Sequence, residues 1–576
     1  MARFAALVKA HPGWAVFVVA CLYAAAVTWP VPVHMWTMIY GLPGDSTGTV
    51  FGYWSWVHAL QSGHSVFSND SVGAPLGSGM EGNPYFVVQF VAHLLLTFVV
   101  GPVASYNLGI LSSFPLTAVV TFWLGRELGF TRLGAAFAGL AFAFVPIHVE
   151  KAMGHEMQTH MEIFSAVLLF GVRWWKAGRR RDLVFMGLGG GLAIWSDPYM
   201  AYITAFMIAA FFAVSLATRR RPGEGFGRSL GVHAVAALAM LGVVALFLPA
   251  AVLMAHRPGT GSYAAAISSS VSDLHRTMAE IEVYSAHFHD YVLPWEENPW
   301  VPATVKALEQ ANLHGSNFTE SSLFLGYTVM LLGLVGLVLG RRRLPIALGL
   351  GLIAVGYWFS LPPTIPLGPL TLHAPSYYLS SIAPVYRVYS RFGFLVLLGA
   401  CLLAGLGFTA VQERLSGVRV RRWGWLAIIP FVTIALEFHN FPPTYTYAIF
   451  PAPAEYQWLL GQPRGIVAEY PMWPWGPIEE ILNRNYSLYV MFHHHPVLNG
   501  AAVGGAAWNA YPTLERYDDP AVVARLRRLG IRYVLVHVDW YRRITADATP
   551  ASVPGLEYVD TIDGTLLFRV SGVTGA

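Results

Sequence analysis

The chain has 576 residues, of which 55% are hydrophobic and only 12% are charged, and its mean hydropathy is +0.50. Soluble domains carry about 25% charged residues, so the composition excludes a water-soluble protein and indicates a polytopic membrane protein. The formal net charge is +4. Arginines cluster beside apolar runs, which fits membrane topology and argues against nucleic-acid binding. Cys21 and Cys401 lie in apolar runs, so no disulfide framework is expected.

Twelve apolar runs are candidates for membrane spans, which need about 20 residues each. Basic loops favour the cytoplasmic side, and the arginine clusters at 176–182, 218–222 and 341–343 share that side only if one early run does not cross. The run that does not cross is predicted to be residues 85–100, because it is short and contains Gln89 and His93; we expect it to lie at the membrane interface. The remaining runs begin near Gly13, Ala104, Leu133, Met161, Leu183, Ala201, Gly231, Leu323, Leu344, Phe392 and Trp423.

The predicted fold is therefore a polytopic α-helical membrane protein with about eleven transmembrane helices, external interfacial helices and a cytoplasmic N-terminus. External loops are expected at residues 31–102, 148–158, 197–199, 255–322 and 361–391. Long ordered loops in a compact protein usually carry function.

Composition changes after the last predicted span, so we divide the chain into a membrane domain, residues 1–439, and a small external α/β domain, residues 440–576. The segments RGIVAEYPM and IRYVLVHV are typical of buried strands. The segment PAVVARLRRLG predicts an amphipathic helix that ends at Gly530. LEYVDTIDGTLLFRV predicts a hairpin with Asp563 and Gly564 at its turn.

Asp45 is the first candidate for a chemical role. It precedes an amphipathic stretch in which Val50, Trp54 and Val57 share one helical face. Its carboxylate is expected at the outer membrane surface, where it could accept a proton from a hydroxyl group. Asp is also a preferred N-cap, and the spacing alone favours that role.

The segment HVEKAMGHEMQTHME, residues 148–162, concentrates Glu150, His155, Glu156 and His160 in one predicted external loop. His155 and His160 are five residues apart, so they do not form the helical histidine pair of a zinc protease. Glu156 and His160 share a helical face and could bind a metal or a sugar. A solvated polar loop explains the same composition equally well.

Four further residues are weaker candidates for substrate binding. His287 and His289 would fall on one side of their segment if it were extended, with Asp290 on the other, although a solvated loop is the simpler interpretation. Asp197 and Glu320 lie at the ends of predicted spans, where a buried carboxylate is costly and often functional.

Arg387 and Arg391 are four residues apart, which predicts one helical face at the outer mouth of a span. The planar fork of arginine suits phosphate because it donates two hydrogen bonds at once. A clamp for an ordinary lipid headgroup is the alternative.

Together these features resemble the GT-C superfamily of integral-membrane glycosyltransferases. The likeness rests on Asp45 in GLPGDS, the interfacial helix, and the run from GPVASYNLG to GHEMQTHMEIF. ESSLFLGYTVMLLGLVGL, VYRVYSRFGFLVLLGACLLAGLG and VVARLRRLGIRYVLVH extend it over most of the chain. It is most similar to the bacterial branch with an external C-terminal α/β domain.

This resemblance implies transfer of a sugar from a polyprenyl-phosphate donor to a glycan, lipid or protein acceptor outside a bacterial plasma membrane. Asp45 would act as the general base of an inverting reaction. Arg387 and Arg391 would hold the leaving phosphate, and His155, together with Glu156 and His160, would line the pocket. Ser46 follows Asp45 where many relatives carry a second acidic residue, so no cofactor is assigned and a divalent cation stays open.

A non-catalytic lipid or polysaccharide transporter, or an assembly factor of the cell envelope, is the alternative. Asp45 would then be only a helix cap. Transporters often show internal repeats with paired interrupted helices, and the sequence has no evident repeat, which favours the enzyme.

Overall fold

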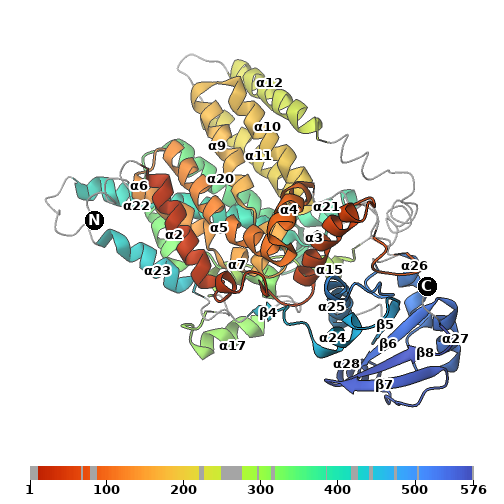
Figure 1. Cartoon of the computed structure of the whole chain (residues 1–576). Helices are drawn as coiled ribbons and strands as arrows, with labels where there is room; N and C mark the ends of the chain where they lie inside the picture. Colours follow the sequence, from red (N-terminus) through yellow and green to blue (C-terminus); the bar gives the residue numbers. More distant parts are fainter. Residues whose placement is uncertain are drawn as a thin grey trace.

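The structure is a computed structural model, and it describes residues 11–66, 69–77, 87–218, 226–247, 276–294, 298–312, 318–384, 386–416, 426–439, 445–472, 477–501 and 505–573. Helices dominate the chain before residue 440, and a small sheet lies near its end (Figure 1). The helices of the first part are α2 (Pro12–Val27), α3 (Asp45–Gln61), α4 (Val87–Val100), α5 (Pro102–Glu127), α6 (Arg132–Ala143), α7 (Pro146–Ala152), α8 (Glu156–Thr159), α9 (Glu162–Ala177), α10 (Arg180–Ser196), α11 (Pro198–Thr218), α12 (Phe226–Ala245), α15 (Met278–Val283), α16 (Phe288–Val292), α17 (Ala303–Asn312), α18 (Phe318–Ser321), α19 (Tyr327–Leu339), α20 (Arg343–Ser360), α21 (Pro375–Ile382), α22 (Gly393–Ser416) and α23 (Ile429–Glu437).

Helix α22 is the central packing element of the membrane part. It packs against α6, α19 and α20, and its apolar side chains are almost all buried. Small residues bring these helices close together: a Cβ atom at Gly336 or Gly407 would overlap the backbone of the facing helix. Without a hydrophobic force between helices in lipid, such close van der Waals contact stabilises their association.

Five helices in the described part of the chain are long and apolar enough to cross a membrane: α5, α11, residues 227–245 within α12, α20 and residues 389–415. If α6 and α7, which are bent by 45° at a short break, form one span, the number is six. Shorter apolar helices cover 12–27, 88–100, 327–339 and 426–437. An integral membrane protein is thus confirmed, whereas eleven spans are not.

Helix α4 corresponds to the run predicted to lie at the interface. Its 14 residues would span about 21 Å, less than the roughly 30 Å of the hydrocarbon core. Gln89, His93 and Thr97, spaced four apart, are buried, whereas Leu95 and Val99 on other faces are exposed. One side of the helix therefore buries polar side chains against the protein, and His93 on this side makes hydrogen bonds to other helices.

Three local predictions are wrong. Residues 148–162 form α7, α8 and the start of α9 rather than a solvated loop, because apolar neighbours on both sides bury them. Arg387 precedes the short 3₁₀ helix Tyr389–Phe392 that contains Arg391, so the two arginines do not share a helical face. His289 lies in α16 and His287 is its N-cap, so that segment is not extended.

The C-terminal segment contains the predicted sheet. Strands β5 (Ile466–Tyr470) and β6 (Ile531–His537) are parallel, and the hairpin of β7 (Leu556–Ile562) and β8 (Thr565–Val570) completes the order β5-β6-β8-β7. Asp563 and Gly564 both have positive φ, 47° and 80°, as a tight hairpin turn requires. The other elements are β4 (Thr446–Ala448), α24 (Ala454–Leu460), α25 (Pro477–His493), α26 (Ala506–Ala510), α27 (Pro520–Arg528) and α28 (Val538–Thr545).

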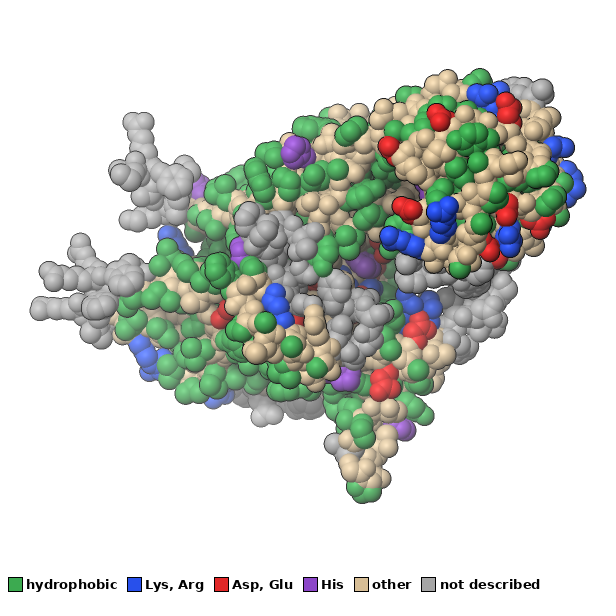
Figure 2. Space-filling model, turned by 90° about the horizontal axis from the view of Figure 1, so that it is seen from below, with side chains coloured by type: hydrophobic (Ala, Val, Ile, Leu, Met, Phe, Trp, Pro, Cys, Tyr) green, Lys and Arg blue, Asp and Glu red, His purple; other side chains and the backbone are tan. Residues whose placement is uncertain are grey.

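Two elements of this segment contact the membrane part. Strand β4 pairs with β1 (Met38–Tyr40), and α25 packs against α3. Charged side chains gather at the right of Figure 2, where the C-terminal sheet lies, whereas the rest of that face is largely hydrophobic. The domain division at residue 439 stays a prediction, and the contacts bring the C-terminal segment to the start of α3.

Candidate active site

Asp45 occupies the first turn of α3 and does not cap it. Gly44, with φ 134°, is the N-cap residue, and its N–H donates to Thr47 Oγ1 at 3.0 Å. The capping alternative for Asp45 is therefore wrong. Its side chain is 46% exposed, so the carboxylate is reachable, and its position favours the negative charge because it faces the positive end of the helix dipole.

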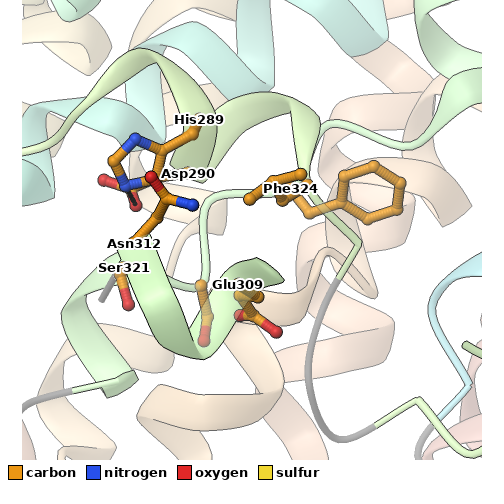
Figure 3. A pocket seen from close by; sticks show the side chains of 8 residues that line it. His289, Asp290, Glu309, Asn312, Ser321 and Phe324 are labelled. Atoms are coloured by element: carbon orange, nitrogen blue, oxygen red, sulfur yellow. Dashed lines mark ion pairs between the residues drawn. The ribbon is translucent and has the colours of Figure 1, made fainter. Parts of the chain in front are cut away.

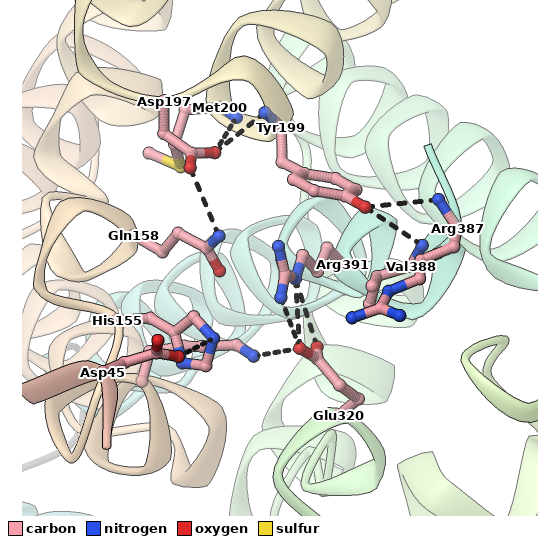
Figure 4. A network of polar contacts seen from close by, with 11 residues as sticks. Asp45, His155, Gln158, Asp197, Tyr199, Met200, Glu320, Arg387, Val388 and Arg391 are labelled. Carbon is pink, nitrogen blue, oxygen red and sulfur yellow. Dashed lines mark hydrogen bonds and ion pairs between the residues drawn. The ribbon is translucent and has the colours of Figure 1, made fainter. Parts of the chain in front are cut away.

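Two side chains approach the Asp45 carboxylate from different segments. Arg484 Nη2 of α25 lies 3.0 Å from Asp45 Oδ1, and His155 Nε2 lies 3.6 Å from Asp45 Oδ2 (Figure 4). Burial and the positive charges of Lys151 and Arg391 lower the pKa of His155 to about 4. His155 is therefore neutral at pH 7, and its contact with Asp45 is polar rather than ionic.

Behind His155 lies a buried charge cluster made of Lys151, Glu320 and Arg391 (Figure 4). Lys151 Nζ donates to Glu320 Oε1 at 2.5 Å, and Arg391 Nη2 donates to the same oxygen at 2.6 Å. These side chains are 0%, 4% and 8% exposed. Burial opposes the charge of Glu320, but Arg391 and Lys151 hold its pKa well below the usual range. Two cations share one carboxylate, so these three side chains together carry one net positive charge, and the buried Glu150 and Asp197 lie nearby.

Tyr199 and Asp197 border this cluster. The Arg391 guanidinium lies 4.3 Å from the centre of the Tyr199 ring, a cation–π contact. Asp197 Oδ1 accepts from the N–H groups of Tyr199 at 2.8 Å and Met200 at 3.0 Å, and thereby caps α11. Burial raises the pKa of Asp197. Gln158 Nε2, 3.4 Å from Asp197 Oδ2, joins this cap to α8.

Glu156 is fully engaged in a separate buried junction. His93 Nε2 lies 2.6 Å from Glu156 Oε1, the Tyr53 hydroxyl donates to Glu156 Oε2, and His93 Nδ1 lies 2.8 Å from Ser105 Oγ. Burial opposes its charge, yet His93 lowers the pKa of Glu156. This junction joins α3, α4, α5 and α8 and leaves only 1% of Glu156 exposed.

His160 pairs with Glu162 at 2.8 Å. Burial disfavours the charge of His160, but Glu162 raises its pKa to about 9. The predicted joint site of His160 and Glu156 is not formed, because the chain leaves α8 at His160. Glu150 is 1% exposed on α7, so the structure places it inside the protein.

The remaining candidates lie apart from Asp45. Arg387 Nη1 donates to Glu280 Oε1 at 2.6 Å, and Arg387 does not contact Glu320. The His287 and His289 rings stack with centroids 5.4 Å apart, and Asp290 contacts both residues, an arrangement that an extended segment would not allow.

His289 and Asp290 line a small pocket together with Glu309, Asn312, Ser321 and Phe324 (Figure 3). The pocket lies where α16, α17 and α18 meet, and Ser321 directly follows Glu320. Polar side chains from three short helices therefore converge on this pocket, one residue along the chain from Glu320 of the charge cluster.

The described residues do not gather three or more His, Cys, Asp or Glu side chains in a geometry that could hold a metal ion. Beside Asp45 the described chain supplies one imidazole and an arginine. These groups do not fit a divalent cation site.

The comparisons with known proteins concern the fold. No family model and no curated protein matches the chain. Arabinofuranosyltransferase AftD from Mycobacteria has a TM-score of 0.51 at 12% identity, over 96% of this chain and 41% of its own. ArnT from Cupriavidus metallidurans, solved with undecaprenyl phosphate, has 0.49 at 12%, over 98% and 99%. The oligosaccharyltransferase of Archaeoglobus fulgidus has 0.47 at 14%, over 92% and 70%.

All three are GT-C glycosyltransferases. The likeness to AftD shows that this chain has the GT-C fold, as the resemblance implied. The chain spans only 41% of AftD, so what the rest of that protein does has no bearing here.

Sequence reasoning missed three residues around the candidate site. Lys151 lies inside the segment 148–162 of a chain with few lysines. Its position beside apolar sequence could have indicated a buried charge. Tyr199 follows the predicted span end at Asp197. Arg484 is more than 400 residues from Asp45 in the sequence, and no spacing could have joined them.

Proposed function

We propose that this chain is a membrane glycosyltransferase that moves a sugar from a polyprenyl-phosphate carrier to an acceptor hydroxyl on the external face. The observation that carries the proposal is the position of Asp45. A half-exposed carboxylate at the start of α3 stands, with His155 between, beside a buried cluster of net positive charge. A base and an anion site are thus adjacent within a GT-C fold.

In this mechanism Asp45 accepts the proton of the acceptor hydroxyl as its oxygen bonds to the anomeric carbon. The bond between that carbon and the phosphate oxygen breaks on the opposite side, which inverts the configuration. The electron pair leaves with the phosphate of the carrier. General-base catalysis of this kind contributes roughly 10²- to 10⁴-fold in rate, and fixed charges that face the leaving group contribute further.

Arg391 and Lys151 are the proposed partners of the leaving phosphate. Both are held by Glu320 at 2.6 and 2.5 Å, so their positions are fixed before the donor arrives. A phosphate that approaches the cluster meets two cations that share one direct carboxylate partner, Glu320. Binding therefore requires no new ordering of long side chains, which preserves binding energy.

The other predicted binding residues take supporting roles in the proposal. Asp197 and Glu156 fix α11 and α8 around the cluster through the contacts described above, and Glu150 and His160 belong to the same buried framework. His287 and His289 belong to the start of α16, and Arg387 precedes the 3₁₀ helix Tyr389–Phe392; in this proposal they border the path of the acceptor or the sugar. The sugar and the acceptor, whether glycan, lipid or protein, are not specified by these residues.

The proposal is tested by turnover in reconstituted vesicles. Undecaprenyl-phosphate mannose, glucose and arabinose are supplied with a mixed pool of glycan, lipid and peptide acceptors, and released undecaprenyl phosphate is measured by mass spectrometry. Asp45→Asn keeps the size of the side chain and removes the base, so we expect loss of about 10²-fold or more in kcat. Asp518→Asn, which alters an exposed Asp–Arg pair in the C-terminal segment, is the matched control.

Equal turnover by wild type and Asp45→Asn would exclude Asp45 as the base. No release from any donor by wild type would favour the transporter or assembly role, with binding of the same lipids then measured directly.

A further inference from the structure

The contact between Asp45 and Arg484 joins the candidate catalytic residue to the C-terminal segment. Arg484 lies on α25, which packs along α3 (Figure 1). Its Nη2 atom is 3.0 Å from Asp45 Oδ1, and both side chains are partly exposed, 36% and 46%. Among the described residues, Arg484 supplies the only ion pair from a lysine or arginine to Asp45.

Two further features of α3 hold this contact in place. The Thr47 hydroxyl donates to Asn485 Oδ1 at 3.0 Å, so the residue next to Arg484 is fixed to the same turn. Gly48 lies beneath the arginine: a Cβ atom at this position would be 2.9 Å from Arg484 Nη1 and 3.4 Å from its Cδ. The absence of a side chain at Gly48 therefore leaves the space that the guanidinium occupies.

The two carboxylate oxygens of Asp45 have different surroundings. Oδ1 faces Arg484, and Oδ2 faces His155. Since His155 is neutral at pH 7, the arginine is the charged partner. One oxygen is thus held by a strong charge-assisted contact, and the other remains available toward the buried cluster.

We propose that Arg484 is a positioning residue: it holds Asp45 Oδ1 across Gly48 so that Oδ2 is presented to the acceptor hydroxyl. This inference rests on the proposed function of Asp45. It makes the C-terminal segment part of the active site, because the residue that orients the base comes from α25. A displacement of a reacting group by about 1 Å can cost about a hundredfold in rate.

The test uses two substitutions that break the same contact in different ways. Arg484→Ala removes the guanidinium, and Gly48→Ala displaces it while every charged group stays in the chain. Arg484→Ala is expected to lower kcat by about tenfold to a hundredfold with an unchanged KM for the lipid donor, and Gly48→Ala is expected to lower kcat by a smaller factor, because the end of the arginine side chain shifts to relieve the contact. The double variant is expected to be no worse than Arg484→Ala, because Gly48 acts only through the arginine. Arg484→Lys is expected to restore part of the rate.

Gly52→Ala is the matched control for the glycine. It lies one turn further along α3, and a Cβ atom there meets no other atom within 4 Å. Both glycine substitutions raise helix propensity by a similar amount, so only Gly48→Ala reports on Arg484. Gly52→Ala is expected to keep wild-type kcat.

A second measurement needs no substrate. Asp45 is accessible enough for carbodiimide labelling, quantified by mass spectrometry against the exposed carboxylate of Glu557. The labelled fraction of Asp45 is expected to rise in Arg484→Ala and in Gly48→Ala and to stay unchanged in Gly52→Ala. Unchanged labelling in both contact variants would overturn the proposed hold on Asp45.

The activity results separate this inference from the proposed function. If Asp45→Asn is inactive while Gly48→Ala or Arg484→Ala turns over at the wild-type rate, Arg484 does not position the base, although Asp45 is one. If Asp45→Asn keeps full activity, the proposed function fails, and the labelling result stands by itself. Additive losses in the double variant would also overturn the inference.

Discussion

At the scale of single residues, Glu320 stabilises the buried cations Lys151 and Arg391 through direct ion pairs. It accepts from both Lys151 and Arg391, and removal of its charge takes away the carboxylate that both buried cations contact directly. Breaking a buried pair by removing one partner costs about 3 to 5 kcal/mol. Each cation in turn is kept near the candidate phosphate site by this one carboxylate.

We therefore expect Glu320→Gln to lower the melting temperature of the detergent-purified protein strongly. Glu413→Gln is the control, because its pair with Arg342 is exposed and such pairs are worth about 0 to 1 kcal/mol. Similar melting temperatures for the two variants would contradict a stabilising role of Glu320.

The same residue gives a prediction of pH dependence. The pKa of Glu320 is held well below its usual range in the folded protein, so its contribution to stability is fully present above the unfolded value of about 4.3. It is lost progressively as pH falls further, since the unfolded chain then binds the proton more readily. The difference in melting temperature between wild type and Glu320→Gln should be constant from pH 7 to pH 5 and should shrink below about pH 4.3.

At the scale of elements, α4 is attached to the core by polar contacts. Its short length and exposed apolar residues give it little burial of its own, and His93 joins it to Glu156 of α8 and Ser105 of α5. Gly109 of α5 leaves the space for this junction: a Cβ atom there would overlap Glu156 Oε1 and lie 2.8 Å from His93 Cε1.

Gly109→Ala is accordingly expected to destabilise the protein by about 1 to 3 kcal/mol, the usual cost of overpacking, despite the higher helix propensity of alanine. Gly231→Ala in α12 is the control, since a Cβ atom there has nothing within 4 Å. Thermal unfolding of both variants in the same detergent measures the difference, and equal stability would show that the junction adapts to the methyl group.

At the scale of the whole molecule, the direction of insertion remains a prediction. The arginine clusters place residues 176–182 in the cytoplasm and the C-terminal segment outside. Ala177 and Ala551 are both exposed, so each suits a single cysteine in a background with Cys21→Ser and Cys401→Ser.

In intact cells a membrane-impermeant maleimide should label Ala551→Cys, whereas Ala177→Cys should react only after permeabilisation. The reverse pattern would invert the topology and place the candidate site on the cytoplasmic side. Both positions are expected to be labelled in permeabilised cells, which controls for their accessibility.

Local sequence determined a large part of this structure. The apolar composition identified a membrane protein, because so few charged residues cannot cover the surface of a soluble protein. Strand alternation and the Asp563–Gly564 turn located β5, β6 and the final hairpin, since these depend on neighbours within a few residues. The prediction failed for 148–162, where the polar residues suggested a solvated loop, although Lys151, Glu156 and Gln158 are buried and contact side chains of other segments.

Only the tertiary structure decided the candidate site. Asp45 could be singled out from the sequence, but its exposure and its partners could not, because His155 and Arg484 reach it from segments more than 100 and more than 400 residues away. The pairing of Lys151 and Arg391 through Glu320 likewise depends on how α7, α18 and the 3₁₀ helix Tyr389–Phe392 pack. Hydrophobic periodicity and secondary-structure propensity act within one helix or strand. The partner of a buried charge, in contrast, comes from a different element and depends on how the elements pack.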